Sequence, residues 1–236
     1  MTRTGDPRLA ALRTAFPYTV PILAGFLFLG LAYGIYTNVS GFSFWYPMAM
    51  SAIIFGGSLE FIATALLLSP FAPLQTFLLA LMVQGRHIFY GISMFEKYRG
   101  TGWKKPYLIY GMCDESFSIN YTAKIPQGID TGWFMFFVTL LNQLYWVAGA
   151  TIGGLVGTQL PINTEGIDFA MTALFVVIFI EQWLNDPQHC TGILGLVAAG
   201  IALAAFGRDS FMLPTMFIIL AGCLAARPFI ERRAST

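Results

Sequence analysis

Three short stretches of this sequence place ionisable side chains inside otherwise apolar runs. They are Phe55-Gly-Gly-Ser-Leu-Glu60, Gln84-Gly-Arg86-His87 and Asp114-Glu115. A charged side chain at the centre of a membrane-spanning helix costs about 2.5–3.5 kcal/mol on insertion scales, so each of these residues needs a reason to be there. We therefore look for a functional site among these three stretches.

The first stretch combines helix-weakening residues with an acid. Two glycines and a serine in the middle of an apolar run free backbone groups that lipid cannot satisfy. We expect Gly57 and Ser58 to present backbone N–H groups to a bound carboxylate, and Glu60 to bind an ammonium group or a proton. The alternative is a glycine packing notch in which Glu60 has a structural partner.

The second stretch carries two basic side chains. Arg86 lies about 20 Å along a helix from Pro73, too deep for its charge to reach the membrane surface easily. A guanidinium at this depth can hold a carboxylate by two hydrogen bonds. His87 can change its charge near neutral pH and is a candidate proton carrier. The alternatives are a structural ion pair of Arg86 with Glu60 or Asp114, and a buried neutral His87.

The third stretch has two adjacent carboxylates, Asp114 and Glu115. Adjacent residues on a helix cannot both face one partner, so one is expected to cap or pair and the other to face a cavity. We expect Asp114 to contribute to substrate binding and Glu115 to proton transfer. The alternative is a turn exposed to water at the membrane surface.

The composition predicts the elements that must position these residues. Of 236 residues, 56% are hydrophobic and only 11% are charged, against about 25% in soluble domains. We predict an all-α, polytopic membrane protein with six to eight helical segments, two of them interrupted in mid-membrane. It is expected to form a single domain over residues 1–236 in a cytoplasmic membrane. The expected apolar segments are 16–36, 44–69, 73–95, 132–157, 166–184, 188–207 and 210–226.

The orientation of the chain stays open at this point. Basic residues place the N-terminus, the loop 97–105 and the C-terminal tail on the cytoplasmic side. Three crossings before residue 97 would put that loop outside. Either one of the two interrupted runs is re-entrant, or the loop is external and residues 107–125 cross the membrane.

Several classes of function are not indicated. The sequence has no His-Glu-x-x-His, Gly-x-Ser-x-Gly or Walker loop, so we do not expect an enzyme or an ATP-driven pump. The three cysteines lack the paired spacing of a metal site, and we expect no metal and no cofactor. The net charge of +1 gives no sign of a nucleic-acid partner.

Taken together, the three stretches resemble the AzlC family, the large subunits of bacterial branched-chain amino-acid exporters. The resemblance is carried by Gly57-Ser-Leu-Glu60-Phe61, Arg86-His87-Ile-Phe-Tyr90-Gly91, and Asp114-Glu115 followed by Phe117. It implies an exporter that acts with a small AzlD-type membrane subunit. Family members carry Gln or Glu at the position of Glu60, and an acid there allows proton coupling.

A branched-chain amino acid fits these residues chemically. Arg86 or freed N–H groups suit its carboxylate, Glu60 or Asp114 its ammonium group, and aromatic residues such as Tyr90 its aliphatic side chain. The alternative is a channel, or a structural subunit without its own substrate site.

A glycine series marks a further surface. Gly149, Gly153 and Gly157 recur at every fourth position, a pattern typical of close helix packing in membranes. We expect this face to be exposed in the isolated chain and to bind the small subunit or a second copy.

Overall fold

The computed structural model describes residues 6–157 and 189–207, with further single positions between 176 and 222. The described part of the chain is helical, without strands. It forms two compact units, residues 1–170 and 171–236, and each is treated by itself. The segments expected at 166–184 and 210–226 lie outside the continuously described ranges.

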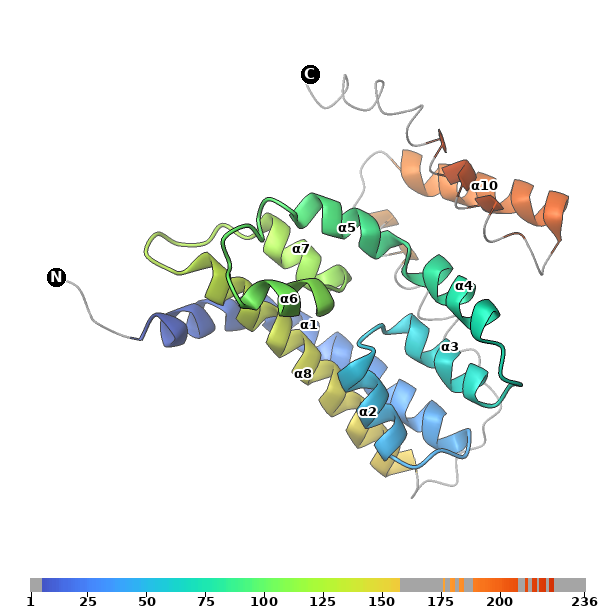
Figure 1. Ribbon diagram of the computed structural model, residues 1–236, viewed down its shortest axis with the longest axis horizontal. Helices are drawn as coiled ribbons and strands as arrows, with labels where there is room; N and C mark the ends of the chain where they lie inside the picture. Colours follow the sequence, from blue (N-terminus) through green and yellow to red (C-terminus); the bar gives the residue numbers. More distant parts are fainter. Residues whose placement is uncertain are drawn as a thin grey trace. The chain divides into compact units, whose positions relative to one another are not determined.

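Two long helices form the frame of the first unit (Figure 1). Helix α1 (Pro7–Val39) has 33 residues and α8 (Thr131–Gly157) has 27, and each contains an 18-residue stretch with a mean hydropathy of 1.8 and 1.4, respectively. At 1.5 Å per residue both exceed the hydrocarbon thickness of about 30 Å. Helix α1 begins nine residues before the expected Phe16, because the Asp6 carboxylate caps it by accepting from the Arg8 N–H at 3.0 Å.

The two frame helices run parallel along their whole contact. Tyr18 meets Phe134 with ring centroids 5.4 Å apart, and Phe26 meets Trp146 at 5.7 Å. Further along, Asn38 lies against Gly157. We call the end where α1 and α8 begin the N-terminal end of the bundle, and the other the C-terminal end.

A helical hairpin, α2 (Trp45–Ile53) and α3 (Ser58–Leu67), enters from the C-terminal end. Pro47 lies against Gly154, near the end of α8. The Ala52 carbonyl, at the end of α2, reaches the middle of α8, where it accepts from Gln143 Nε2 at 3.0 Å. The chain then turns back, and Thr64 of α3 approaches Thr37 with 3.2 Å between hydroxyl oxygens.

The next pair of helices traverses the bundle. Helix α4 (Pro73–Gln84) starts at the C-terminal end, and α5 (Arg86–Met94) continues it after a turn at Gly85. Met94, at the end of α5, belongs to a buried cluster with Ala15 and Phe134. This cluster is the hydrophobic core at the N-terminal end.

A second hairpin, α6 (Lys104–Tyr110) and α7 (Asp114–Thr122), enters from the N-terminal end. Lys104 begins the hairpin beside Trp133, in the first turn of α8. Tyr107 reaches Gln143 in mid-helix, its hydroxyl donating to Oε1 at 2.6 Å. After the turn at residues 111–113 the chain returns, and the Lys124 carbonyl accepts from the Tyr18 hydroxyl at 3.4 Å.

This path favours one of the two orientations left open by the sequence. Arg8 and Lys104 both lie over the Trp133 ring, 4.8 and 4.6 Å from its centroid. The start of α1 and the loop 97–105 therefore share the N-terminal end. The α2–α3 hairpin begins and finishes at the C-terminal end, which makes it the candidate for the re-entrant run.

Both predicted interruptions are present, and a third was not predicted. The breaks lie at residues 54–57, at Gly85 and at residues 111–113. The sequence had marked 107–125 only as a half-apolar stretch. It is a short hairpin rather than a crossing helix.

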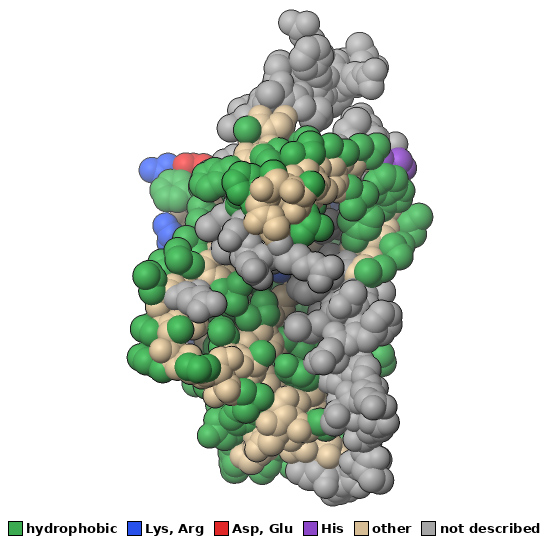
Figure 2. All heavy atoms as spheres, turned by 90° about the vertical axis from the view of Figure 1, so that its right-hand side faces the viewer, with side chains coloured by type: hydrophobic (Ala, Val, Ile, Leu, Met, Phe, Trp, Pro, Cys, Tyr) green, Lys and Arg blue, Asp and Glu red, His purple; other side chains and the backbone are tan. Residues whose placement is uncertain are grey.

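The outer surface of the described residues is largely apolar. Figure 2 shows hydrophobic side chains over most of the coloured surface, with the few charged ones gathered at its edge. Phe28 and Ile53 are each 71% exposed and Phe71 is 93% exposed. Such a surface suits contact with lipid rather than water.

In the second unit, helix α10 (Cys190–Phe206) occupies the segment expected at 188–207. The helix ends before Gly207, where φ is 73°, a conformation that glycine adopts without strain.

Candidate functional site

The three helix breaks meet beside the middle of α8. Gln84, immediately before the break at Gly85, donates from Nε2 to the Gly56 carbonyl in the α2–α3 break at 2.8 Å. Tyr110, immediately before the α6–α7 turn, donates to the carbonyls at the end of α2. The two hairpins, which enter from opposite ends, thus touch tip to tip.

Side chains satisfy the carbonyls that the first break leaves free. The Tyr110 hydroxyl lies 2.7 Å from the Ala52 oxygen and 2.8 Å from the Ile53 oxygen. Gln143 Nε2 also donates to Ala52. Because lipid offers no hydrogen bonds, these contacts are what make an open helix end tolerable at this depth.

Glu60 satisfies the N–H groups on the other side of that break. Its Oε1 accepts from the backbone N–H of Gly56 at 2.9 Å and of Gly57 at 3.2 Å. The indole Nε1 of Trp146 donates to both carboxylate oxygens, at 3.0 and 3.1 Å. The side chain is 0% exposed. We expect from the sequence that Glu60 binds an ammonium group or a proton; in this structure its carboxylate is enclosed, because its own turn and α8 take up its oxygens.

Gly57 and Ser58 lie at the start of α3. Gly57 has φ 52°, a left-handed conformation that favours glycine, and its N–H is bound by Glu60. Ser58 is buried. The Gly57 N–H is therefore taken up by Glu60 in this conformation.

Arg86 pairs with Asp114 across the second and third breaks. Arg86 Nε lies 3.1 Å from Asp114 Oδ1, while the two side chains remain 39% and 30% exposed. The two facing atoms are buried, but they are not aligned as a hydrogen bond. The remaining guanidinium and carboxylate atoms are therefore the accessible part of the pair. This partner is one of the two considered for Arg86 from the sequence.

Aromatic rings border the Arg86–Asp114 pair. Tyr90 stacks on Phe117 with centroids 4.3 Å apart and planes at 11°. His87 meets Tyr90 edge-on at 5.5 Å, and its Nδ1 lies 3.2 Å from the Gln84 carbonyl oxygen. These rings place an apolar aromatic surface next to one cation and one anion.

Glu115 points to a different neighbour from Asp114. It is half-buried and interacts with the Cys113 side chain. Asp114 and Glu115 therefore diverge, as expected for adjacent residues on a helix, and only Asp114 reaches Arg86.

The expectation of an exposed glycine face on α8 was wrong. Gly149, Gly153 and Gly157 are buried against α1 within the same chain. A Cβ on Gly149 would lie 2.8 Å from the Leu27 carbonyl oxygen, and one on Gly153 would collide with the Leu31 backbone. These glycines let the two parallel helices approach backbone to backbone, so they are not available to another chain.

Sequence reasoning missed much of the polar framework. Gln84 stood only as the first residue of the second stretch, and Tyr110 was not singled out. Asn142 is 0% exposed, and neither its Nδ2 nor its Oδ1 has a hydrogen-bonding partner among the described residues. The signal that could have identified these residues is the demand of each broken helix end for polar side chains.

The residues that form this arrangement lie in a part of the sequence that is similar to known proteins. A family model described as AzlC protein matches residues 21–160, which include all three breaks and α8 up to its end. The branched-chain amino acid transport protein AzlC of Bacillus subtilis is 58% identical over 94% of this chain and 88% of its own length. This chain belongs to the AzlC family.

Two further relatives of this chain are also named as membrane proteins. A membrane protein of Haemophilus influenzae is 51% identical over 89% of this chain and 87% of its own length. The inner membrane protein YgaZ of Escherichia coli is 26% identical over 88% of this chain and 86% of its own length. No solved structure matches. The apolar helices, together with the similarity to these membrane proteins, show that this AzlC-family chain is an integral membrane protein.

Proposed function

We propose that this chain is a transporter of branched-chain or related small apolar amino acids, and that the accessible Arg86–Asp114 pair is the centre of its substrate site. The observation that carries the proposal is this pair, held where three broken helix segments meet. The name of the Bacillus subtilis relative supports the substrate class. Broken helices around a central site are a common design in membrane transporters.

An amino acid can replace the interaction that the two side chains make with each other. Its carboxylate binds the Arg86 guanidinium and its ammonium group binds Asp114. The site is electrically neutral before and after binding, so no unpaired charge is left in the membrane at either stage. A zwitterion fits this exchange, whereas a simple anion or cation leaves one partner uncompensated.

The stacked rings supply the remaining specificity. Tyr90 and Phe117 present an aromatic surface beside the charged pair. An aliphatic side chain packs on such a surface through the hydrophobic effect, and a polar one does not. Gly57 and Ser58 join the substrate site only if Glu60 first releases the N–H groups of the α3 start.

Proton coupling is proposed for Glu60, with His87 and Glu115 as further carriers. The described groups that hydrogen-bond to the Glu60 carboxylate are all donors, and these bonds favour its charged form. Among the described residues, its Oε2 accepts only from Trp146, so a proton placed there competes with that bond. Protonation of Oε2 removes one of the two Trp146 contacts while Oε1 still holds the α3 start and the indole, so proton uptake weakens the link between α3 and α8.

We further propose that transport is directed out of the cell and that the chain acts with a small AzlD-type subunit. The surface for this subunit is not the glycine face of α8, which α1 already covers. The subunit instead packs on the apolar outer surface.

The alternative is a channel, or a structural subunit without its own substrate site. A channel gives flux that rises with concentration without saturation. A structural subunit gives no leucine binding when purified alone.

The test uses the purified full-length chain, alone and with any small subunit that co-purifies, in proteoliposomes. Saturable leucine binding and counterflow are expected. Arg86→Lys is expected to weaken leucine binding about 10–100-fold, because the loss of a charge-assisted hydrogen bond costs about 1.5–3 kcal/mol. Asp114→Asn should act similarly, since it removes the partner of the ammonium group.

Matched controls are Arg13→Lys and Asp6→Asn, which change the same residue types at the exposed start of α1. Unchanged leucine binding in both Arg86→Lys and Asp114→Asn would refute the assignment of the site. Non-saturating flux in the wild type would favour the channel.

A further inference from the structure

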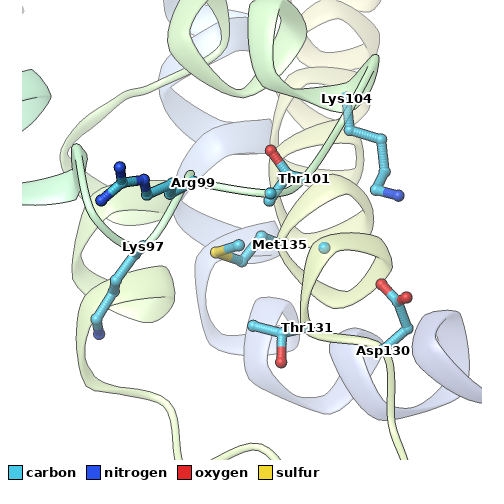
Figure 3. A pocket seen from close by; sticks show the side chains of 9 residues that line it. Lys97, Arg99, Thr101, Lys104, Asp130, Thr131 and Met135 are labelled. Carbon is cyan, nitrogen blue, oxygen red and sulfur yellow. The ribbon is translucent and has the colours of Figure 1, made fainter.

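A separate cavity lies at the N-terminal end of the bundle, away from the helix breaks. Its volume is about 320 Å³, within the range of small-molecule sites, and it lies between the loop after α5 and the first turn of α8. Its lining residues are Lys97, Arg99, Gly100, Thr101, Lys104, Asp130, Thr131, Gly132 and Met135. Figure 3 shows Lys97 and Arg99 on one side, Lys104 and Asp130 on the other, and Thr101 and Met135 between them.

The cavity has an excess of positive charge that the protein does not neutralise. Three basic side chains face one acid, and that acid is engaged: Asp130 Oδ1 caps α8 by accepting from the Trp133 N–H at 2.7 Å. Among the described residues, neither Lys97 nor Lys104 has a carboxylate within 4.0 Å.

Two of the three cations remain free to bind a ligand. Lys97 is bound to the carbonyls at the end of α7. Among the described residues, the charged partner of Arg99 is Glu96, at 3.4 Å in a highly exposed contact, and such surface pairs contribute little. Lys104 lies over the Trp133 ring, and its three N–H donors have no hydrogen-bond acceptor within the described part of the chain.

The surroundings place this cavity at the level of lipid headgroups. Trp103, Trp133 and Phe136 form an edge-to-face cluster beside it, and Trp103 is exposed. Tryptophan rings gather where the membrane meets water. The loops at the opposite end, residues 40–44 and 68–72, contain no charged residue, so the positive-inside rule places the cavity in the cytoplasmic leaflet.

We propose that this cavity binds the phosphate group of an anionic phospholipid of the cytoplasmic leaflet. Arg99 and Lys104 hold the phosphate oxygens, and the Thr101 and Thr131 hydroxyls serve a polar headgroup. The exposed ring of Trp103, which packs with Trp133 and Phe136, adjoins the acyl chains. The proposal does not depend on what the chain transports.

The test is native mass spectrometry of the full-length protein released from nanodiscs of equal parts phosphatidylglycerol and phosphatidylcholine. The wild type is expected to retain phosphatidylglycerol in preference to phosphatidylcholine. The double variant Arg99→Gln/Lys104→Gln should lose this preference by roughly tenfold, because each removed charge weakens attraction to anionic lipid. The control Arg13→Gln/Lys105→Gln removes the same charge outside the cavity and should keep the preference.

Three outcomes overturn the proposal. The first is equal retention of the two lipids by the wild type, and the second is equal loss in the double variant and its control. The third is binding of inorganic phosphate that depends on Arg99 and Lys104 without any lipid preference, which assigns the cavity to a free anion. If the double variant does not fold, Lys104→Gln alone is compared with Lys105→Gln on the same criteria.

Discussion

Gln84 Nε2 donates to the Gly56 carbonyl oxygen at 2.8 Å, so one side-chain hydrogen bond joins the breaks of two helices. The two residues are 28 positions apart, and among the described residues no backbone hydrogen bond links these two breaks. Its removal leaves the half-buried Gly56 carbonyl with the Leu59 N–H, at 3.2 Å, as its remaining donor, and loses the net stabilisation of one hydrogen bond.

Gln84→Met is therefore expected to destabilise the fold by about 0.5–1.5 kcal/mol, since methionine keeps the length of the side chain without its donor. Gln84→Glu should be as damaging, because a carboxylate facing a carbonyl is repulsive. Thermal unfolding in detergent measures both. The control is Gln127→Met, in an exposed loop; equal stability of all three variants and the wild type would contradict the role of this bond.

Glu60→Gln separates the structural role of this residue from its proposed role in coupling. A glutamine oxygen can still accept from the N–H groups of Gly56 and Gly57, so the chain should fold. Its amide group replaces Oε2, so the Trp146 indole N–H keeps its bond to the remaining oxygen and loses its second acceptor. The variant imitates the protonated state, and leucine transport should lose its dependence on pH between about 6 and 8.

The measurement is leucine efflux from vesicles with and without an imposed proton gradient. Trp146→Phe is the companion variant, since it removes the same contact from the other side. If Glu60→Gln keeps the wild-type pH dependence, Glu60 is a structural cap only.

Asn142 allows a test that separates an effect on stability from an effect on transport activity. Its amide is fully buried and unpaired among the described residues, which costs free energy. Asn142→Leu is similar in size and should leave the melting temperature unchanged or higher. If the amide serves a transported molecule, leucine counterflow should fall at least tenfold. A loss of stability together with activity would instead mean that the amide supports the fold.

The glycine contact between α1 and α8 predicts a defect in folding rather than in assembly. Gly153→Leu places a side chain into the Leu31 backbone and should destabilise the chain by about 1–3 kcal/mol or more. Gly25→Leu is the control, because nothing lies within 4 Å of its Cβ position. A Gly153→Leu chain of normal stability that fails only to bind a second protein would contradict this.

The hairpin arrangement fixes which loops share a side of the membrane. In a background where the native cysteines are replaced by serine, Glu96→Cys and Gln127→Cys should react alike with a membrane-impermeant maleimide. By the positive-inside rule, both should need permeabilised cells. Ser69→Cys, between α3 and α4, should react in intact cells. Reaction of Ser69→Cys and Glu96→Cys from the same side would exclude a re-entrant α2–α3.

The sequence was sufficient for the class of protein and the position of two breaks, because composition and mid-run glycines report directly on both. It could not reveal that residues 107–125 turn back, since a seven-residue helix such as α6 has no distinctive periodicity. Nor could it show that Asp114, and not Glu60, reaches Arg86. That choice depends on Trp146, which is 86 residues from Glu60 and binds both of its carboxylate oxygens.

The two hairpins that meet tip to tip also have a mechanical consequence. The Tyr110 hydroxyl of one hairpin holds the carbonyls of Ala52 and Ile53 at the tip of the other. Because Gln143 of α8 also donates to the Ala52 carbonyl, a movement of either tip along α8 must break or shift these hydrogen bonds together. A displacement of one hairpin is therefore transmitted to the other.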